Sequence, residues 1–264
     1  MRQNPAVTKR VRLDQLLVQR SLAPSRERAQ ALILAGVVRV DGERAARAAA
    51  PVAEDAALEV EASPRYVSRG GEKLAGALDA FALDVSGIVA IDVGSSTGGF
   101  TDVLLQRGAA RVHAIDVGKG QLEWKLRTDP RVVVHEGVNA REGIPVGETV
   151  DLVVADVSFI SLRLVLPPAL AHLRDGGDVV ALVKPQFEAG REAVGPGGVV
   201  RDPEVRAAAV LSVARELASR GVPVVAVAPS VIAGREGNRE IFVHARKGAR
   251  EMVDIESAAR KAAE

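Results

Sequence analysis

The sequence of 264 residues contains no cysteine. This absence excludes a disulfide framework, a thiol nucleophile and thiolate metal ligands, and it fits a reducing compartment. Histidine is also scarce: His113, His135, His172 and His244 are scattered along the chain without the spacing of a metal site. We therefore expect no metal centre and no requirement for a metal.

Long apolar runs are missing as well. No window reaches about 18 uninterrupted apolar residues, and the richest stretch, 152–173, is broken by Asp156, Arg163 and a pair of prolines. The first residues, Met1 to Pro5, carry no apolar segment of the kind found in secretory signals. The sequence thus predicts a cytoplasmic protein that makes no use of a membrane.

Charge is nearly balanced over the whole chain, with a formal net charge of +1. Its distribution is uneven, because residues 1–47 hold ten Lys and Arg against four Asp and Glu. A local positive excess of this kind favours a basic N-terminal module that meets an anionic partner. The alternative is an arginine-rich surface that is merely solvated.

The N-terminal part of the chain combines short helices and strands. Residues 13–17 place leucines on one helical face, and Ser25 predicts the N-cap of a second helix. Residues 37–40 are typical of a strand, Asp41-Gly42 of a hairpin turn, and 57–60 of a further short strand. Two helices followed by a strand hairpin, with arginines spread over them, form a small RNA-binding layout.

Three segments in this part resemble the RNA-binding module of the ribosomal-protein-S-four type, the alpha-L fold: residues 12–17, 25–26 and 36–42. Such modules bind structured RNA through charge and shape. The resemblance implies a small α+β RNA-binding domain over residues 1–60. Its candidate RNA-binding residues, with two near the following linker, are Arg10, Arg12, Arg20, Arg26, Arg28, Arg39, Arg65 and Arg69.

The rest of the chain alternates between apolar strand patterns and helical patterns. We expect a linker at 61–67, a second domain at 68–248 and a C-terminal tail helix at 249–264. A helix is predicted at 72–81, and strands are predicted at 88–93, 111–116, 131–135, 151–155, 178–183, 222–227 and 240–245. This order predicts an α/β domain with a doubly wound, mainly parallel seven-stranded sheet, whose last strand pair is antiparallel at or near an edge.

A glycine-rich turn follows the first predicted strand, in the segment Ile91-Asp92-Val93-Gly94-Ser95-Ser96-Thr97-Gly98-Gly99-Phe100. The spacing G-x-x-x-G-G departs from the dinucleotide fingerprint G-x-G-x-x-G, but it resembles the S-adenosylmethionine (SAM) turn of class I methyltransferases. Asp116 ends the next strand, where a carboxylate can accept hydrogen bonds from both hydroxyls of a ribose. A turn that binds nothing is the alternative. The expected cofactor is SAM, with candidate contacts at Asp92, Gly94, Ser95, Ser96, Thr97, Gly98, Gly99, Phe100, Asp116, Val117 and Asn139.

Lysine is rare beside arginine, with seven Lys against 28 Arg, so a lysine at a strand end stands out. Lys184 and Asp156 each follow a predicted strand, and both are expected at the carboxyl edge of the sheet, where ligands bind. Lys73 lies near the start of the domain, and Glu240 opens the last strand. In this chain order, Lys73, Asp156, Lys184 and Glu240 resemble the catalytic tetrad of FtsJ-like ribose 2′-O-methyltransferases.

Longer motifs make the resemblance more specific. Segments 68–74, 156–161, 184–188 and 195–202 are similar to those of the TlyA family, and the similarity runs from about Lys9 to Lys247. The resemblance implies a Rossmann-like, SAM-dependent methyltransferase domain behind the RNA-binding module. It also implies ribosomal RNA as the partner, with a cytidine in assembled or assembling ribosomal subunits as the target.

The resemblance also implies a mechanism. A ribose 2′-hydroxyl is a weak nucleophile and must lose its proton as the methyl group moves. Lys184 is the expected base, Lys73 disfavours its protonated form by like-charge repulsion, and Asp156 and Glu240 orient the two ammonium groups. The carboxylates oppose that repulsion, so the outcome depends on distances, and alignment of the reacting groups is a further source of catalysis.

Some alternatives stay open. Residues 188–202 predict either a mobile loop that orders over RNA near Lys184 or a passive surface loop. Trp124, between Leu122 and Leu126, favours packing over base stacking. Some relatives carry the label haemolysin, which implies a membrane-lytic protein, and a non-catalytic protein that binds SAM and ribosomes is the other alternative. The oligomeric state is not predicted.

Overall fold

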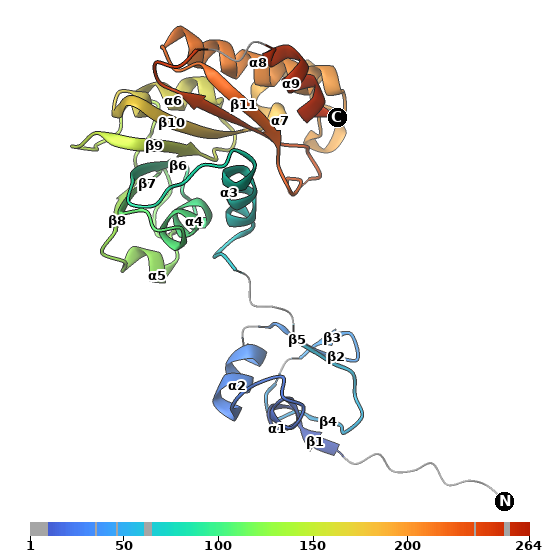
Figure 1. Cartoon of the computed structure of the whole chain (residues 1–264). Coiled ribbons are helices and arrows are strands. Elements are labelled where there is room, and N and C mark those ends of the chain that lie inside the picture. The colour runs from blue at the N-terminus through green and yellow to red at the C-terminus, as the bar shows by residue number, and fades with distance from the viewer. Residues whose placement is uncertain (1–9, 35, 46, 61–64, 235, 251–253) are drawn as a thin grey trace, which may run out of the picture. The chain divides into compact units, whose positions relative to one another are not determined.

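The chain forms two compact units, residues 1–65 and 66–264, seen in a computed structural model (Figure 1). The structure describes residues 10–34, 36–45, 47–60, 65–234, 236–250 and 254–264. Each unit has an apolar core of its own.

The first unit is a small α+β domain. Its helices are α1 (Leu13–Gln19) and α2 (Arg26–Leu34). Three antiparallel strands form one sheet, β3 (Glu43–Arg44), β2 (Val38–Val40) and β5 (Leu58–Val60), and a second sheet pairs β1 (Arg10–Arg12) with β4 (Pro51–Ala53). The β1–β4 pair was not predicted from the sequence, because three-residue strands carry little periodicity.

The local signals in this unit act as expected. The Ser25 Oγ accepts a hydrogen bond of 3.2 Å from the Arg28 N–H and so caps α2. Asp41 and Gly42 both have positive φ, 50° and 83°, as a two-residue hairpin turn requires. The prediction of two helices and a strand hairpin is confirmed.

Asp14 ties the two helices of the first unit together. Its carboxylate is fully buried and accepts hydrogen bonds from Arg12, at 3.0 and 2.8 Å, from Arg26 at 3.2 Å and from Gln30 at 3.0 Å. The hydrogen-bonded guanidinium of Arg12 holds the pKa of Asp14 well below its usual range. The motif Arg12-Leu13-Asp14 is therefore a structural clamp.

The second unit is built on one seven-stranded sheet. In sheet order, its strands are β11 (Val224–Pro229), β12 (Ile241–Arg246), β10 (Leu173–Val183), β9 (Val150–Ala155), β6 (Val89–Val93), β7 (Arg111–Asp116) and β8 (Val132–Glu136). Only β12 is antiparallel to its neighbours; the other pairs are parallel. The predicted mainly parallel sheet with an antiparallel final pair at its edge is confirmed.

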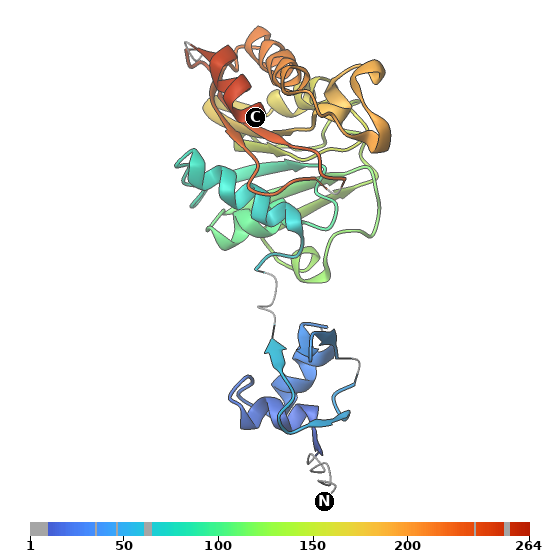
Figure 2. The same ribbon diagram turned by 90° about the vertical axis from the view of Figure 1, so that its right-hand side faces the viewer.

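Helices cover both faces of this sheet (Figure 2). Helices α3 (Arg69–Ala80) and α4 (Gly99–Gln106) lie on one face, and α6 (Leu162–Leu170), α8 (Pro203–Ser219) and α9 (Ile255–Ala263) lie on the other. Val154 and Val180 pack toward the first set, whereas Val153 and Val179 pack toward the second. Successive strand residues point to opposite faces, so these strands are apolar on both.

Both ends of the second unit differ from the predicted boundaries. Tyr66 and Val67, expected in the linker, belong to this unit, because Tyr66 is only 3% exposed and packs over Gly71. The expected tail helix is α9, and it is part of the core rather than a free tail, since Ala259 and Ala263 are fully buried. Residues 61–64 of the expected linker lie outside the described residues.

Candidate active site

The four predicted catalytic residues come from four places in the second unit that meet at one edge of the sheet. Asp156 directly follows β9, and Lys184 follows β10 and precedes the short helix α7 (Pro185–Glu188). Glu240 stands just before the antiparallel β12, so the start of that strand lies at the same edge. Lys73 sits in the first turns of α3.

A cavity of about 550 Å³ brings the four side chains together. The Lys184 Nζ lies 2.7 Å from the Asp156 Oδ1 and donates to the Ser158 Oγ at 2.9 Å. The Lys73 Nζ donates to the Glu240 Oε2 at 2.5 Å. Each ammonium is thus paired with a carboxylate, and Glu240 compensates the positive charge of Lys73 locally.

A second cavity, of about 510 Å³, opens between the carboxyl ends of β6, β7 and β9. Gly94, Ser96, Asp116, Val117 and Asn139, all predicted cofactor contacts, line it. The Asp116 carboxylate accepts backbone N–H groups of Ser96, at 2.8 Å, and of Gly118, at 2.7 Å. A carboxylate has about four acceptor positions, so these two bonds fix its orientation and leave capacity for a ligand.

A third, polar cavity of about 170 Å³ is lined both by the glycine-rich turn and by two of the four predicted catalytic residues. Ser95, Thr97, Gly99 and Phe100, also predicted contacts, line it together with Gly94 and Ser96, and so do Asp156 and Lys184. The N-terminal turns of α3 and α4 both contribute to its wall, so backbone N–H groups without helical partners border it. Such a wall favours an anionic group.

Two predicted cofactor contacts lie elsewhere. Asp92 is fully buried beneath the turn, where the Thr101 Oγ1 donates to its Oδ2 at 2.7 Å. Burial raises the pKa of Asp92 to about 7. Gly98 has φ +95°, and a Cβ there would lie 2.3 Å from the Leu126 Cδ1 and 2.8 Å from the Leu122 Cδ1. Both residues shape the turn from behind and line none of the three cavities.

Gly94 brings the glycine-rich turn close to Asp156. Its φ is +83°, and a Cβ there would lie 2.6 Å from the Asp156 carbonyl oxygen. The Asp156 N–H in turn donates to the Val93 carbonyl at 3.0 Å. Glycine is therefore required for β6 and the Asp156 segment to pass this close.

Asn139 lines the second cavity, yet its side chain is engaged in its own turn. Its Nδ2 donates to the Glu142 Oε1 at 2.6 Å, and its Oδ1 accepts from the Arg141 N–H at 3.2 Å. Both bonds are exposed. The arrangement places the 139–142 turn at the rim of the cavity.

An aromatic pair that the sequence did not predict lines the cavity that holds the four side chains. Phe159 is 91% exposed, and its ring centroid lies 5.1 Å from that of Phe187. Both rings line the cavity that holds the tetrad. Phe159 also has φ +64°, which is unfavourable for a side chain of this size. An aromatic directly after Asp156-Val157-Ser158 was the available signal.

Glu188 explains part of the motif Lys184-Pro185-Gln186-Phe187-Glu188. It is buried, and its carboxylate accepts from the Ser161 Oγ at 2.5 Å and from the Leu162 N–H at 2.7 Å. A carboxylate at the N-terminus of α6 complements the free N–H groups there. Glu188 thereby fixes α7, and the residues around Lys184, against the segment that carries Phe159.

The segment 188–202, expected to be either mobile or passive, is hydrogen-bonded near its C-terminal end to Asn238. It contains two short 3₁₀ turns, 191–193 and 196–198. Asn238, which is 1% exposed, donates to the Gly198 carbonyl at 2.8 Å and accepts from the Val200 N–H at 3.0 Å. The segment is thus bonded to the loop that leads into Glu240.

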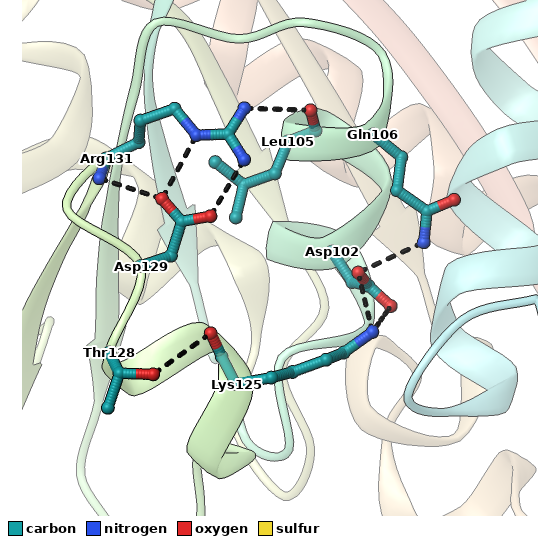
Figure 3. A network of polar contacts seen from close by, with 7 residues as sticks. All are labelled: Asp102, Leu105, Gln106, Lys125, Thr128, Asp129 and Arg131. Atoms are coloured by element: carbon teal, nitrogen blue, oxygen red, sulfur yellow. Dashed lines mark hydrogen bonds and ion pairs between the residues drawn. The ribbon is translucent and has the colours of Figure 1, made fainter.

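Helix α5 (Trp124–Arg127) is held against α4 by polar contacts. The Lys125 side chain points at the Asp102 carboxylate (Figure 3). Its Nζ lies 3.2 Å from both carboxylate oxygens, and Asp102 also accepts from the Gln106 Nε2 at 3.1 Å. Asp102 is buried and accepts from the Val67 N–H as well, at 2.9 Å. Trp124 does not pack here as predicted: it is 71% exposed, because Leu122 and Leu126 alone turn inward.

The predicted RNA-binding arginines fall into two groups. Four of the first unit have intramolecular partners: Arg12 and Arg26 bind Asp14, Arg20 donates to the carbonyls of Ala56 and Glu54, and Arg39 donates to that of Gly42. Arg69, at the catalytic cavity, donates to the Ala233 carbonyl at 2.9 Å. Arg10, Arg28 and Arg65 are exposed, and no side-chain hydrogen bond or ion pair joins Arg10 or Arg28 to another described residue.

Comparison with known proteins decides the family. Residues 66–247 match the FtsJ-like methyltransferase family, and residues 11–57 match the S4 domain. The "16S/23S rRNA (cytidine-2'-O)-methyltransferase TlyA" of Mycobacterium tuberculosis is 52% identical over 244 residues, which are 91% of each chain. The chain belongs to the TlyA family. The "Putative rRNA methyltransferase YqxC" of Bacillus subtilis is 47% identical over 90% of this chain and 86% of its own.

A solved structure extends the similarity to the fold of the whole chain. The "Putative hemolysin from Streptococcus thermophilus" is 40% identical, with a TM-score of 0.72, over 97% of this TlyA-family chain and 96% of its own. That name says nothing of how this chain acts. Among the described residues, no helix combines the length and the apolar character needed to cross a membrane.

The methyltransferase domain of this TlyA-family chain uses SAM. The residues present fit that cofactor. The 510 Å³ cavity joins a carboxylate, Asp116, to apolar walls that include Val117 and Val138, which suits a nucleoside. The 170 Å³ cavity at the two helix N-termini suits the carboxylate of an amino acid.

Proposed function

We propose that this chain transfers the methyl group of SAM to the ribose 2′-hydroxyl of a cytidine in ribosomal RNA, in the cytoplasm, with Lys73, Asp156, Lys184 and Glu240 as catalytic residues. The observation that carries the proposal is the shared wall of two cavities. Asp156 and Lys184 line both the tetrad cavity and the polar cavity behind the glycine-rich turn. The Mycobacterium tuberculosis relative, 52% identical, is named as an rRNA (cytidine-2'-O)-methyltransferase, which supports the proposal.

The cofactor residues follow from the same arrangement. In this proposal Asp116 binds the ribose hydroxyls of SAM, with Val117 and Asn139 beside the adenine and Gly94 through Thr97 along the rest of the molecule. Gly99 and Phe100 lie where α4 begins and face the amino-acid end. When bound, SAM supplies a methyl group made electrophilic by the positive charge on its sulfur.

The chemistry then needs a group that removes one proton. The 2′-oxygen would lose its proton to the unprotonated Lys184 Nζ as it bonds the methyl carbon, and the sulfur of SAM would keep the electron pair of the S–C bond that breaks. Asp156, 2.7 Å away, stabilises the ammonium that results. Ser158, which accepts from the same nitrogen at 2.9 Å, fixes its direction.

Lys73 and Glu240 act as a second, neutral pair in the same cavity. The Lys73 Nζ directs its charge at Glu240, and its remaining N–H groups are available to the 2′-oxygen of the acceptor. In the transition state that oxygen carries partial negative charge, which a nearby ammonium stabilises. Alignment of the acceptor in the cavity supplies the rest.

In this proposal the aromatic pair and the first unit bind the RNA substrate. Phe159 and Phe187 offer faces on which a nucleobase can stack, which is a common way to hold an unpaired base. The S4 domain binds the surrounding RNA through Arg10 and Arg28, whose charges are free among the described residues, and through the remaining N–H groups of Arg12, Arg20, Arg26 and Arg39. Arg65 and Arg69 complete this set, and Arg69 lines the catalytic cavity.

The test is transfer of labelled methyl from SAM to unmodified ribosomal subunits, with Lys184→Ala and Lys184→Arg beside the unaltered protein. Label on a ribose 2′-oxygen, lost in both variants while SAM binding persists, supports the enzyme and its base, because arginine stays protonated. Label on a nucleobase overturns the tetrad mechanism. No label on either subunit, with SAM bound, favours a protein that binds SAM and RNA without catalysis.

A further inference from the structure

Gln186 is a polar residue of the catalytic cavity that the proposed reaction leaves without a role. It lies on α7, two residues after Lys184, and lines the cavity that holds the tetrad. Its Oε1 is buried, and no hydrogen-bond donor within the described part of the chain reaches it. A buried amide oxygen of this kind is destabilising unless something binds it.

The position of Gln186 is fixed on both sides. Pro185 starts α7, and Glu188 at its end accepts from the Ser161 Oγ and the Leu162 N–H. The backbone that carries Gln186 is therefore held while its amide oxygen stays without a donor. A rigid support and an unsatisfied acceptor are typical of a group placed for a ligand.

The neighbours of Gln186 indicate which part of a ligand it meets. Phe187 follows it directly, and Phe187 and Phe159 form the aromatic pair of the same cavity. A nucleobase stacked on this pair lies in the cavity that Gln186 lines. Its polar edge, and not its ribose, is what a glutamine amide recognises.

We propose that Gln186 selects the target base, its Oε1 accepting a hydrogen bond from the exocyclic amino group of a cytosine. This inference rests on the proposed function and names the feature of the substrate that the site reads. Uracil carries a carbonyl oxygen at the same position, so with the Gln186 amide in the orientation seen here the two oxygens would repel each other and leave the buried acceptor without a donor.

The experiment compares ribosomal subunits that carry cytidine at the mapped methylation site with subunits that carry uridine there. Gln186→Leu removes the acceptor at similar volume, and Gln186→Glu keeps an acceptor oxygen in place. Gln106→Leu, on the far end of α4, is the matched control. The readouts are kcat/KM on each substrate and the dissociation constant for SAM.

Gln186→Leu is expected to lower kcat/KM on the cytidine substrate by about 10-fold or more and to bring the cytidine-to-uridine ratio close to one. Its SAM affinity should match that of the unaltered protein. Gln186→Glu should keep the preference for cytidine, and Gln106→Leu should keep both values.

An unchanged cytidine-to-uridine ratio in Gln186→Leu overturns the inference and leaves the proposed function standing. A parallel loss of SAM binding also overturns it, since the residue would then be structural. If Gln186→Leu does not fold, the ratio measured with Gln186→Glu decides, and loss of the preference there counts against the inference. Absence of methyl transfer by the unaltered protein defeats the proposed function itself, and the inference with it.

Discussion

Lys73 and Glu240 form a buried ion pair, 2.5 Å long, between residues 167 positions apart. Their side chains are 11% and 3% exposed. The pair joins the first helix of the methyltransferase domain to its last strand. Gly234 makes room for it, because a Cβ there would lie 2.7 Å from the Glu240 Oε1. The ion pair is thus part of the proposed site, and it also links the N-terminal and C-terminal parts of the domain.

Removing one partner of this pair should be costly. Glu240→Leu leaves the Lys73 ammonium buried and unpaired, so we expect the free energy of unfolding to fall by about 3 kcal/mol or more. Lys73→Met combined with Glu240→Leu leaves no charge uncompensated and should recover most of that loss. Urea denaturation of the three proteins measures both effects.

Methyl transfer separates stability from chemistry in this series. The double variant should be stable and inactive, because neither residue can then act on the acceptor. A double variant as unstable as Glu240→Leu would show that the site needs the pair for packing. A stable and active double variant would remove Lys73 and Glu240 from the mechanism.

Gly94→Ala should weaken SAM binding. The new Cβ would meet the Asp156 carbonyl oxygen at 2.6 Å, and φ of +83° is itself unfavourable for alanine. Either the turn or the Asp156 segment must shift, and both line the polar cavity. We expect the dissociation constant for SAM, measured by calorimetry, to rise by about 10-fold or more, since a loss of 1.4 kcal/mol corresponds to tenfold.

The control for Gly94→Ala is Gly147→Ala, where no atom lies within 4 Å of the added Cβ. It should bind SAM as the unaltered protein does. Equal affinity in all three proteins would mean that the glycine-rich turn is not part of the SAM site.

The sequence was most informative where chemistry and topology coincide. Parallel strands end at one edge of a sheet, so Asp116, Asp156 and Lys184 could be placed together from their positions after apolar runs. The turn after β6 was recognisable because its glycines answer a local need for positive φ, as at Gly94. Features of this kind can be predicted from the sequence because they depend on neighbouring residues and not on distant contacts.

Other features depend on contacts that a linear pattern does not contain. Asp92 and Gly98 sit among the predicted contacts in sequence, but the buried side of the turn faces Thr101 and Leu126. The exposure of Phe159 is set by a strained backbone and by Phe187, 28 residues away. Such features follow from tertiary packing.

Phe159→Gly should separate backbone strain from function. At φ +64° glycine is unstrained, while its extra freedom in the unfolded chain acts in the opposite sense. We expect the free energy of unfolding to change by no more than about 1 kcal/mol. The value of kcat/KM for ribosomal subunits should fall by about 10-fold or more, because stacking on one base is lost.

Trp124→Ala is the matched control for loss of an exposed aromatic. Trp124 is 71% exposed and lies outside the three cavities. It should retain the kcat/KM of the unaltered protein. A fall in kcat/KM of the same size in both variants would show that exposed aromatics contribute generally to RNA binding. It would contradict a specific role of Phe159 in stacking on the target base.

Asp92 should make the stability of the chain depend on pH near neutrality. Burial raises the pKa of this carboxyl to about 7, whereas in the unfolded chain it returns to about 4. Between these values the folded chain holds a proton that the unfolded chain has lost, so stability falls as pH rises, and the loss is complete above pH 7. The amide that Asp92→Asn introduces does not titrate. Relative to the unaltered protein, Asp92→Asn should therefore gain roughly 2–4 kcal/mol of unfolding free energy between pH 5 and pH 8.

Urea denaturation at several pH values, without SAM, measures this difference. Thr101 can still donate to the amide oxygen, so the variant keeps the bond that fixes the turn. Asp175→Asn, which removes a carboxylate that is 98% exposed, controls for the loss of one charge. If the curves of Asp92→Asn and the unaltered protein run parallel from pH 5 to pH 8, the Asp92 carboxyl is ionised in the folded chain. Its buried Oδ1, which has no donor among the described residues, must then be hydrated or bound in solution.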